Sequence, residues 1–303
     1  MPIPDEQLAY EHHLADHRRW GLLRDGTPDE SHWRAKAAQM QYYCVHDALT
    51  HLFVETVALS ERLARGVAFN HIRYGAGRRQ KIICQSVRDL HSVAPPDRRK
   101  PMKQEEVDTA SRALNDFYIH TLGLLDNYAH AVGSQLAGAR FSALRPIKRT
   151  LFSQEFLDCC NSPALRSLVE PFRAWAERLK SLRNPVAHGI PLTVPPAVIT
   201  SEARADHEAA TEAHSAAFNN PPPIDAPDRA DAYAGWAARV QELMNHIESI
   251  GEFQPWIAHD PRAEIVPIYP TVLDDAGMLI RMCRATNRLL AGPGQQTGDA
   301  QGA

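Results

Sequence analysis

The chain has 303 residues, of which 44% are hydrophobic and 23% are charged, and its formal net charge is −3. These values are ordinary for a globular protein, and the length can bury a sizeable core. No apolar run approaches the roughly 18 residues that a membrane span needs, and the N-terminus shows no secretory signal. The five cysteines form no CxxC motif, so we expect a reduced, cytoplasmic protein with no membrane partner.

Charge is distributed unevenly along the chain. Residues 62–200 hold 21 Lys and Arg against 11 Asp and Glu, whereas the balance is 5 against 10 in residues 1–61 and 7 against 15 in residues 201–303. A basic middle of this kind attracts polyanions such as RNA. The alternative is a solvated surface that the acidic ends of the same molecule balance. The candidate RNA-binding residues are Arg78, Arg79, Lys81, Arg145, Lys148 and Arg149.

Apolar residues recur every three or four positions in residues 42–63, 107–136 and 233–247. Each stripe predicts an amphipathic helix with a core to face. Strand signals are few: residues 191–200 and 263–270 are short and interrupted by proline, so we expect edge or loop structure there. The sequence therefore predicts an all-α fold.

Proline-rich breaks separate these helical stretches, and they indicate how the chain is organised. We expect an N-terminal helical segment at 1–99 that packs on a helical core at 100–250. A C-terminal helical segment follows at 251–290, and the Gly- and Gln-rich tail at 291–303 is expected to be disordered.

One further helix is predicted to begin with Ser162 as its N-cap and Pro163 at its first helical position. Its apolar stripe runs from Leu165 to Leu179, and Arg183 is in phase with that stripe. An unpaired charge on an apolar face is costly, so the Arg183 guanidinium needs either a carboxylate from the protein or a phosphate from a ligand.

Asn184 and Pro185 follow this arginine, and His188 comes about one turn later. Proline disfavours helical geometry in the residue before it, so we expect the helix to end or kink at Asn184. A new turn can begin at once, because Asn is a good N-cap and Pro a good first helical residue. Arg183 and His188 would then converge across a tight corner, with a fork for a phosphate and a group that exchanges protons near neutral pH.

The stretch "RNPVAH" at 183–188 resembles the R-x4–6-H motif of the HEPN superfamily, in the form that has Asn directly after Arg. HEPN domains are all-helical bundles found in toxin–antitoxin, abortive-infection and CRISPR-linked ribonucleases. The stretch "LLDNYAHAV" in the preceding helix is similar to the Asp-bearing helix of several bacterial HEPN families, which adds Asp126 and Asn127 as supporting residues. The resemblance covers about residues 100–250 and implies a HEPN-like antiparallel helical bundle with additional helices.

The resemblance also implies a function, namely a metal-independent endoribonuclease without cofactor that acts as a toxin or anti-phage defence effector. In such enzymes the RNA 2′-OH attacks the adjacent phosphate and leaves a 2′,3′-cyclic phosphate and a 5′-OH. His188 would be the general acid or base, Arg183 would hold the scissile phosphate, and Asn184 would orient the pair or bond the phosphate. Such sites are usually composite, so a chain with one motif is implied to form a homodimer, and an antitoxin or regulator is a further implied partner.

Other interpretations stay open at this point. A non-cleaving HEPN module that binds RNA or nucleotides, or that serves assembly, would carry the same motif. An unrelated helical scaffold would use Arg183 structurally, paired with an internal acid such as Asp126. His13 and His17 could share a helix face, but the sequence places no third ligand with them, so we expect no metal site.

Overall fold

The computed structural model describes residues 3–27, 29–225, 228–258 and 265–292, apart from the side chains of Pro185 and His188. These residues are mostly helical, with one small two-stranded antiparallel sheet, which confirms the predicted all-α fold. In chain order the elements are η1 (Asp5–Leu8), α1 (Tyr10–Arg19), α2 (Glu30–Arg62), α3 (Val67–Asn70), the π-helical segment η2 (His71–Ala76), α4 (Gly77–Val93), α5 (Gln104–Leu136), α6 (Ala139–Ala143), η3 (Pro146–Lys148), α7 (Gln154–Cys160), α8 (Pro163–Val169), η4 (Glu170–Phe172), α9 (Arg173–His188), α10 (Arg204–Phe218), α11 (Arg229–Ile247), β1 (Trp256–Ile257), β2 (Val266–Pro267) and α12 (Ile268–Ala291).

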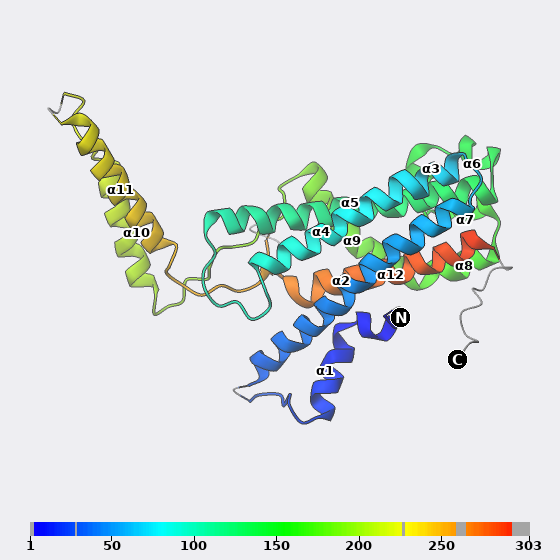
Figure 1. Cartoon of the computed structure of the whole chain (residues 1–303), viewed down its shortest axis with the longest axis horizontal. Helices are drawn as coiled ribbons and strands as arrows, with labels where there is room; N and C mark the ends of the chain where they lie inside the picture. Colours follow the sequence, from blue (N-terminus) through cyan, green and yellow to red (C-terminus); the bar gives the residue numbers. More distant parts are fainter. Residues whose placement is uncertain (1–2, 28, 226–227, 259–264, 293–303) are drawn as a thin grey trace.

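Four long helices, α2, α4, α5 and α12, form the main bundle (Figure 1). The two apolar stripes predicted at 42–63 and 107–136 lie on α2 and α5 and face its core, where Leu49, Leu52 and Phe117 are fully buried. The shorter helix α9 packs against α5. Among the described helices, none combines the length and the apolar character that crossing a membrane requires.

Helices α10 and α11 form a hairpin that projects away from one end of the bundle (Figure 1). The stripe at 233–247 lies on α11, as predicted, but it faces α10 and not the core of the bundle. Ala210 and Leu243 are the buried residues of the two helices. The expectation that this stripe has a core to face is therefore wrong.

The segment that carries Arg183 begins as predicted, because Ser162 Oγ accepts a hydrogen bond from the Leu165 amide at 3.2 Å and Pro163 is the first helical residue. Pro171 lies in the 3-10 turn η4, which separates α8 from α9. Of the end or kink expected at Asn184, the end is wrong, since α9 continues through Pro185 to His188. Pro185 lies in the last turn, where its missing amide removes a single helical hydrogen bond.

A buried carboxylate joins three helices. Asp275 of α12 is fully buried and accepts hydrogen bonds from the Tyr118 hydroxyl of α5 at 3.2 Å and from Trp175 Nε1 of α9 at 3.0 Å. The guanidinium of Arg178, also on α9, pairs with the same carboxylate. Burial raises the pKa of Asp275 to about 6, although the charge of Arg178 and these hydrogen bonds act in the opposite direction. The network fixes the rotation of α9 against α5 and α12.

The contribution of Asp275 to stability is expected to depend on pH. Its pKa of about 6 in the folded chain lies above the ordinary value of 3.8, so the folded state binds this proton more tightly. The contribution is therefore full below about pH 4 and is lost as the pH rises through about 6. Between those values, the free energy of unfolding of the wild type should fall by roughly 2–3 kcal/mol relative to Asp275→Asn, which cannot titrate. Urea unfolding of both proteins at each pH measures this, and a difference that does not change with pH would contradict it.

Candidate functional site

The continuous helix formed by η2 and α4 packs closely on α5 at two glycines. A Cβ atom at Gly75 would collide with the side chain of Asn127, and a Cβ atom at Gly123 would collide with the guanidinium of Arg79. Each glycine is thus covered by a polar side chain from the opposite helix. The two helices are antiparallel, since residues 71, 75 and 79 meet residues 130, 127 and 123. We call the polar row between them the α4–α5 seam, and its members are His71, Arg79, His120, Asn127 and His130.

Arg79 lies across Gly123 and donates a hydrogen bond from Nη1 to His120 Nδ1 at 3.0 Å. A guanidinium can only donate, so His120 Nδ1 is the acceptor and the neutral ring carries its proton on Nε2. Burial and then the charge of Arg79 lower the pKa of His120. At neutral pH this ring is therefore uncharged and holds Arg79 in one orientation.

Asn127 occupies the middle of the seam. It donates from Nδ2 to the carbonyl of Gly123 at 2.6 Å, and its Oδ1 accepts from His71 Nδ1 at 3.1 Å. The His71 ring stacks on His130, with centroids 4.4 Å apart and planes 12° from parallel. Burial, followed by the nearby His71 and Arg149, lowers the pKa of His130. Asn127, predicted to support the motif on α9, hydrogen-bonds instead with His71 and fixes its tautomer.

Asp126 is not part of the seam, and it lies within the electrostatic influence of cations from α4 and α9. Solvent reaches its carboxylate, yet the protein around it displaces enough water to raise its pKa, while Arg79, Arg183 and Lys180 lower that pKa through their charges. Lys180 also pairs with Glu177 at 2.7 Å, so three cations face two carboxylates here. The structure thus brings together three predicted residues, Arg79, Asp126 and Arg183, which the sequence places in three separate helices.

The structure describes only part of the motif at 183–188 on α9. Phe172, Ala176 and Leu179 are buried and Arg183 is half-buried, so the predicted phase of Arg183 with the apolar stripe is confirmed. Asn184 is exposed, whereas the side chain of His188 lies outside the part of the chain that the structure describes. Because α9 is continuous, positions 183 and 188 are about 140° apart around the helix axis. The tight corner that would have brought the two residues together is absent, and their convergence stays a prediction.

Arg149 lies at the far end of the seam from Arg79. Its guanidinium sits 5.6 Å from the centre of the Phe141 ring, and that ring meets His130 edge-on at 5.2 Å. Its position is held by hydrogen bonds to the carbonyls of Ser142 and Leu144, at 2.8 and 2.9 Å. The candidate RNA-binding residues fall at 78–81 and 145–149, and one cation from each group, Arg79 and Arg149, therefore flanks the seam.

The other predicted RNA-binding cations differ in their surroundings. Arg78 and Lys81 are exposed on α4, where they lie over the rings of Tyr74 and Phe53 at 5.6 and 4.8 Å. Arg145 is exposed before η3, and Lys148 pairs with Glu155 at 2.6 Å. Arg78, Lys81 and Arg145 therefore remain accessible to a polyanion, and Lys148 would have to exchange one carboxylate partner for it.

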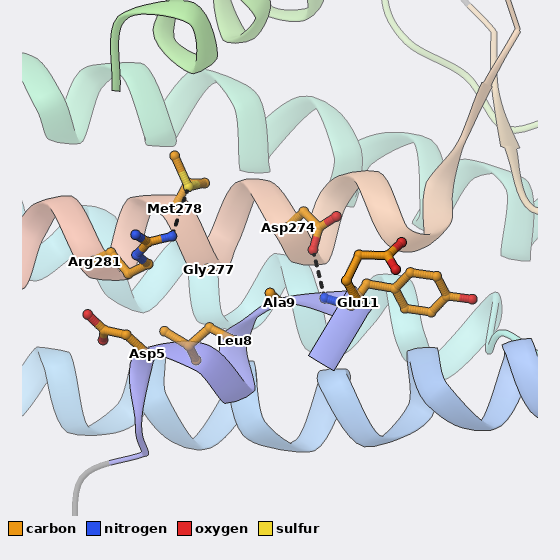
Figure 2. Close-up of a pocket in the computed structure, with 9 residues that line it drawn as sticks. Asp5, Leu8, Ala9, Glu11, Asp274, Gly277, Met278 and Arg281 are labelled. Carbon is orange, nitrogen blue, oxygen red and sulfur yellow. Dashed lines mark hydrogen bonds between the residues drawn. The ribbon is translucent and has the colours of Figure 1, made fainter. Parts of the chain in front are cut away.

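Two surface recesses lie elsewhere. One of about 280 Å³ separates the N-terminal segment from α12, where the Tyr10 amide donates to Asp274 at 3.1 Å (Figure 2). The Leu8 backbone closes part of it against Gly277. Another of about 490 Å³ is lined by residues that include Arg34, Arg99 and Tyr269. Among the side chains that the structure describes, no predicted site residue lines either recess, and we place the candidate site at the seam and the adjoining part of α9.

The histidines of the seam were missed by reasoning from the sequence, although a signal exists. Gly75 and Gly123 each interrupt a stretch of helical periodicity, and a glycine at such a position usually has a packing reason. His71, Gly75 and Arg79 then recur at intervals of four, so they share one helix face. The partner of that face could not be read from the sequence, because it lies about fifty residues further along the chain.

Comparison of the chain with protein-family models, with curated proteins and with solved structures finds no match. The likeness to HEPN domains therefore rests on residues 183–188, on the helix that carries Asp126, and on the all-α fold.

Gly123→Ala tests whether the seam holds Arg79 against His120. The added Cβ displaces the guanidinium, and the loss of its charge should raise the pKa of His120 toward the ordinary value, with burial still holding it lower. NMR titration of the His120 ring measures the change. Gly235→Ala in α11 is the matched control, because its Cβ meets nothing within 4 Å, and it should leave the titration unchanged. Identical His120 titrations in both variants would contradict the assignment.

Proposed function

We propose that this chain binds RNA across α4, α5 and α9 and cleaves it as a metal-independent endoribonuclease of the HEPN kind. The observation that supports this is the approach of Arg79 and Arg183 to a single acid, Asp126, beside the "RNPVAH" stretch. Guanidinium groups bind phosphate in a planar, bidentate manner, which suits both arginines to the oxygens of a phosphodiester.

The proposed reaction needs a base, an acid and a group that stabilises charge on the phosphate. The RNA 2′ oxygen forms a bond to phosphorus while a base takes its proton, and the bond from phosphorus to the 5′ oxygen breaks as that oxygen receives a proton. His188 would transfer a proton in this exchange, Arg183 would hold the scissile phosphate, and Asn184 would orient the pair. Arg79 would bind the same or the adjacent phosphate, held in place by His120.

A composite site fits the geometry of α9 better than a site within one chain. Positions 183 and 188 are about 140° apart around the axis of this helix, which favours a site that takes the two residues from different chains. In the proposal a second copy supplies the missing half of the site. The wider role as a toxin or defence effector, with an antitoxin or regulator as partner, is part of the same proposal.

The second candidate is an RNA- or nucleotide-binding HEPN module that does not cleave. The geometry of α9 favours this non-cleaving module if the chain acts as a single copy. Arg183 would then bind a phosphate, but no histidine would be positioned to transfer a proton. Mixing Arg183→Ala with His188→Ala separates the candidates. In a composite site, the mixed dimer regains one intact Arg and His pair and recovers part of the cleavage that each variant lacks alone.

Cleavage of labelled RNA in the presence of EDTA is the primary test. We expect the wild type to cut and His188→Ala to be inactive. If His188 serves catalysis and not packing, the variant should lose about 0.5 kcal/mol or less of stability and melt within a few degrees of the wild type. Arg183→Ala should also be inactive, and Arg183→Lys should not restore activity because an ammonium lacks the planar fork. Arg112→Ala, an exposed arginine elsewhere on α5, is the control that stays active.

Two results would contradict the proposal. One is cleavage that requires a divalent metal. The other is wild-type cleavage by folded His188→Ala together with a loss of about 3–5 kcal/mol of stability in Arg183→Ala, which would show that the arginine serves the fold and not the reaction.

RNA affinity is expected to fall steeply with salt, because each phosphate contact releases a counterion. Replacing Arg78, Arg79 and Lys81 together by Gln should lower the slope of log affinity against log salt by roughly two to three and leave the cleavage positions unchanged. Replacement of Arg18, Arg19 and Arg24 by Gln is the matched control, since these exposed arginines lie in the acidic N-terminal part. Equal slopes for both triple variants would mean that α4 faces away from the RNA.

A further inference from the structure

The hairpin of α10 and α11, which we call the arm, lacks a core of its own. Each helix packs only a narrow row of side chains against the other. Ala210 is the buried residue of α10, and Leu243 is the buried residue of α11. Most helical stability in proteins comes from packing an apolar face against a neighbour. An arm with so little burial therefore needs a partner surface.

The distal part of the arm carries an aromatic cluster that is open to solvent. Phe218 stacks on His214 and lies 6.3 Å from Trp236, which donates from Nε1 to the carbonyl of Ala217 at 2.8 Å. Phe218 is nevertheless 57% exposed, and Ile224 in the connection between the helices is 73% exposed. Aromatic residues with a fixed orientation are the usual anchors of protein interfaces.

The negative charge of the arm limits which kind of surface can bind it. Residues 204–247 contain seven Asp and Glu against three Arg, and all seven acids are exposed. A surface of this sign repels RNA, and it repels the arm of another copy. The partner of the arm is therefore a basic surface with exposed apolar residues of its own.

The chain itself carries such a surface around α6 and η3. Arg140 and Arg145 are exposed there, Lys148 is partly exposed, and Ile147 between them is 77% exposed. We call this group the α6–η3 patch. It lies at the opposite end of the bundle from the arm, so the arm cannot reach the patch of its own chain (Figure 1).

We propose that the arm of one chain docks on the α6–η3 patch of a second copy, with Phe218 and Ile224 against Ile147 and the arm's acids against Arg140 and Arg145. Helices of 15 and 19 residues are about 22 and 28 Å long. Two such helices can cover the roughly 800 Å² per partner of a standard interface. This inference does not depend on RNA cleavage.

Charge exchange between the two surfaces tests it. An arm variant carries Glu208→Lys, Glu212→Lys and Asp225→Lys, and a patch variant carries Arg140→Glu, Arg145→Glu and Lys148→Glu. We expect the wild-type full chain to sediment as a dimer at micromolar concentration, and each variant alone to dissociate at least about tenfold more readily. An equimolar mixture of the two variants should dimerise again, because reversed charges then face each other.

Controls separate the interface from general effects of charge. Glu6→Lys, Glu11→Lys and Asp47→Lys change the net charge as much as the arm variant does, but on η1, α1 and α2, and should leave the dimer intact. Phe218→Ala should weaken the dimer without a change of charge, and circular dichroism verifies that each variant is folded. A monomeric wild type, dimers of both reversed variants, or a mixture that stays monomeric would each overturn the proposal.

Discussion

The close approach of the η2–α4 helix to α5 is the contact on which the candidate site depends. It exists because Gly75 and Gly123 have no side chain, so that Asn127 and Arg79 can each lie over the backbone of the opposite helix. A larger residue at Gly123 would move a charged group, and one at Gly75 would move the amide that orients His71. Two glycines thereby set the positions of two histidines, an amide and a guanidinium along one line.

A second constraint acts on α9 and is independent of the first. Asp275 is buried beneath three donors, two of which belong to α9, so the helix cannot rotate without leaving the carboxylate unpaired in the interior. With α9 held in this rotation, Arg183 and Lys180 of α9 and Arg79 of the seam all lie near enough to Asp126 of α5 for their charges to lower its pKa. The site is thus the meeting point of two rigid contacts, and no loop is needed to form it.

Periodicity in the sequence was sufficient to predict the helices, the Ser162 cap and the inward phase of Arg183, because all of these are local properties. It could not show what covers an apolar face: the stripes on α5 and α11 look alike, but one is buried in the bundle and the other meets a single helix. The rule that proline disfavours helical geometry in the residue before it favoured an end or a kink at Asn184, whereas α9 continues to His188. The seam and the Asp275 network join residues between about 40 and 160 positions apart, which a local pattern cannot reveal.

The uneven charge of the chain connects the two proposals. The cations at the seam and at the α6–η3 patch lie in the basic middle of the sequence, and the exposed acids of the arm lie in its acidic C-terminal part. If the arm occupies the patch of a second copy, RNA that extends from the seam onto that patch competes with the arm for Arg145 and Lys148. Linkage then requires the effect to be reciprocal: RNA long enough to reach the patch weakens self-association by the same factor by which self-association weakens RNA binding. Short RNA that covers only the seam escapes this competition, and it is the substrate that a dimer held by its arms would bind most readily.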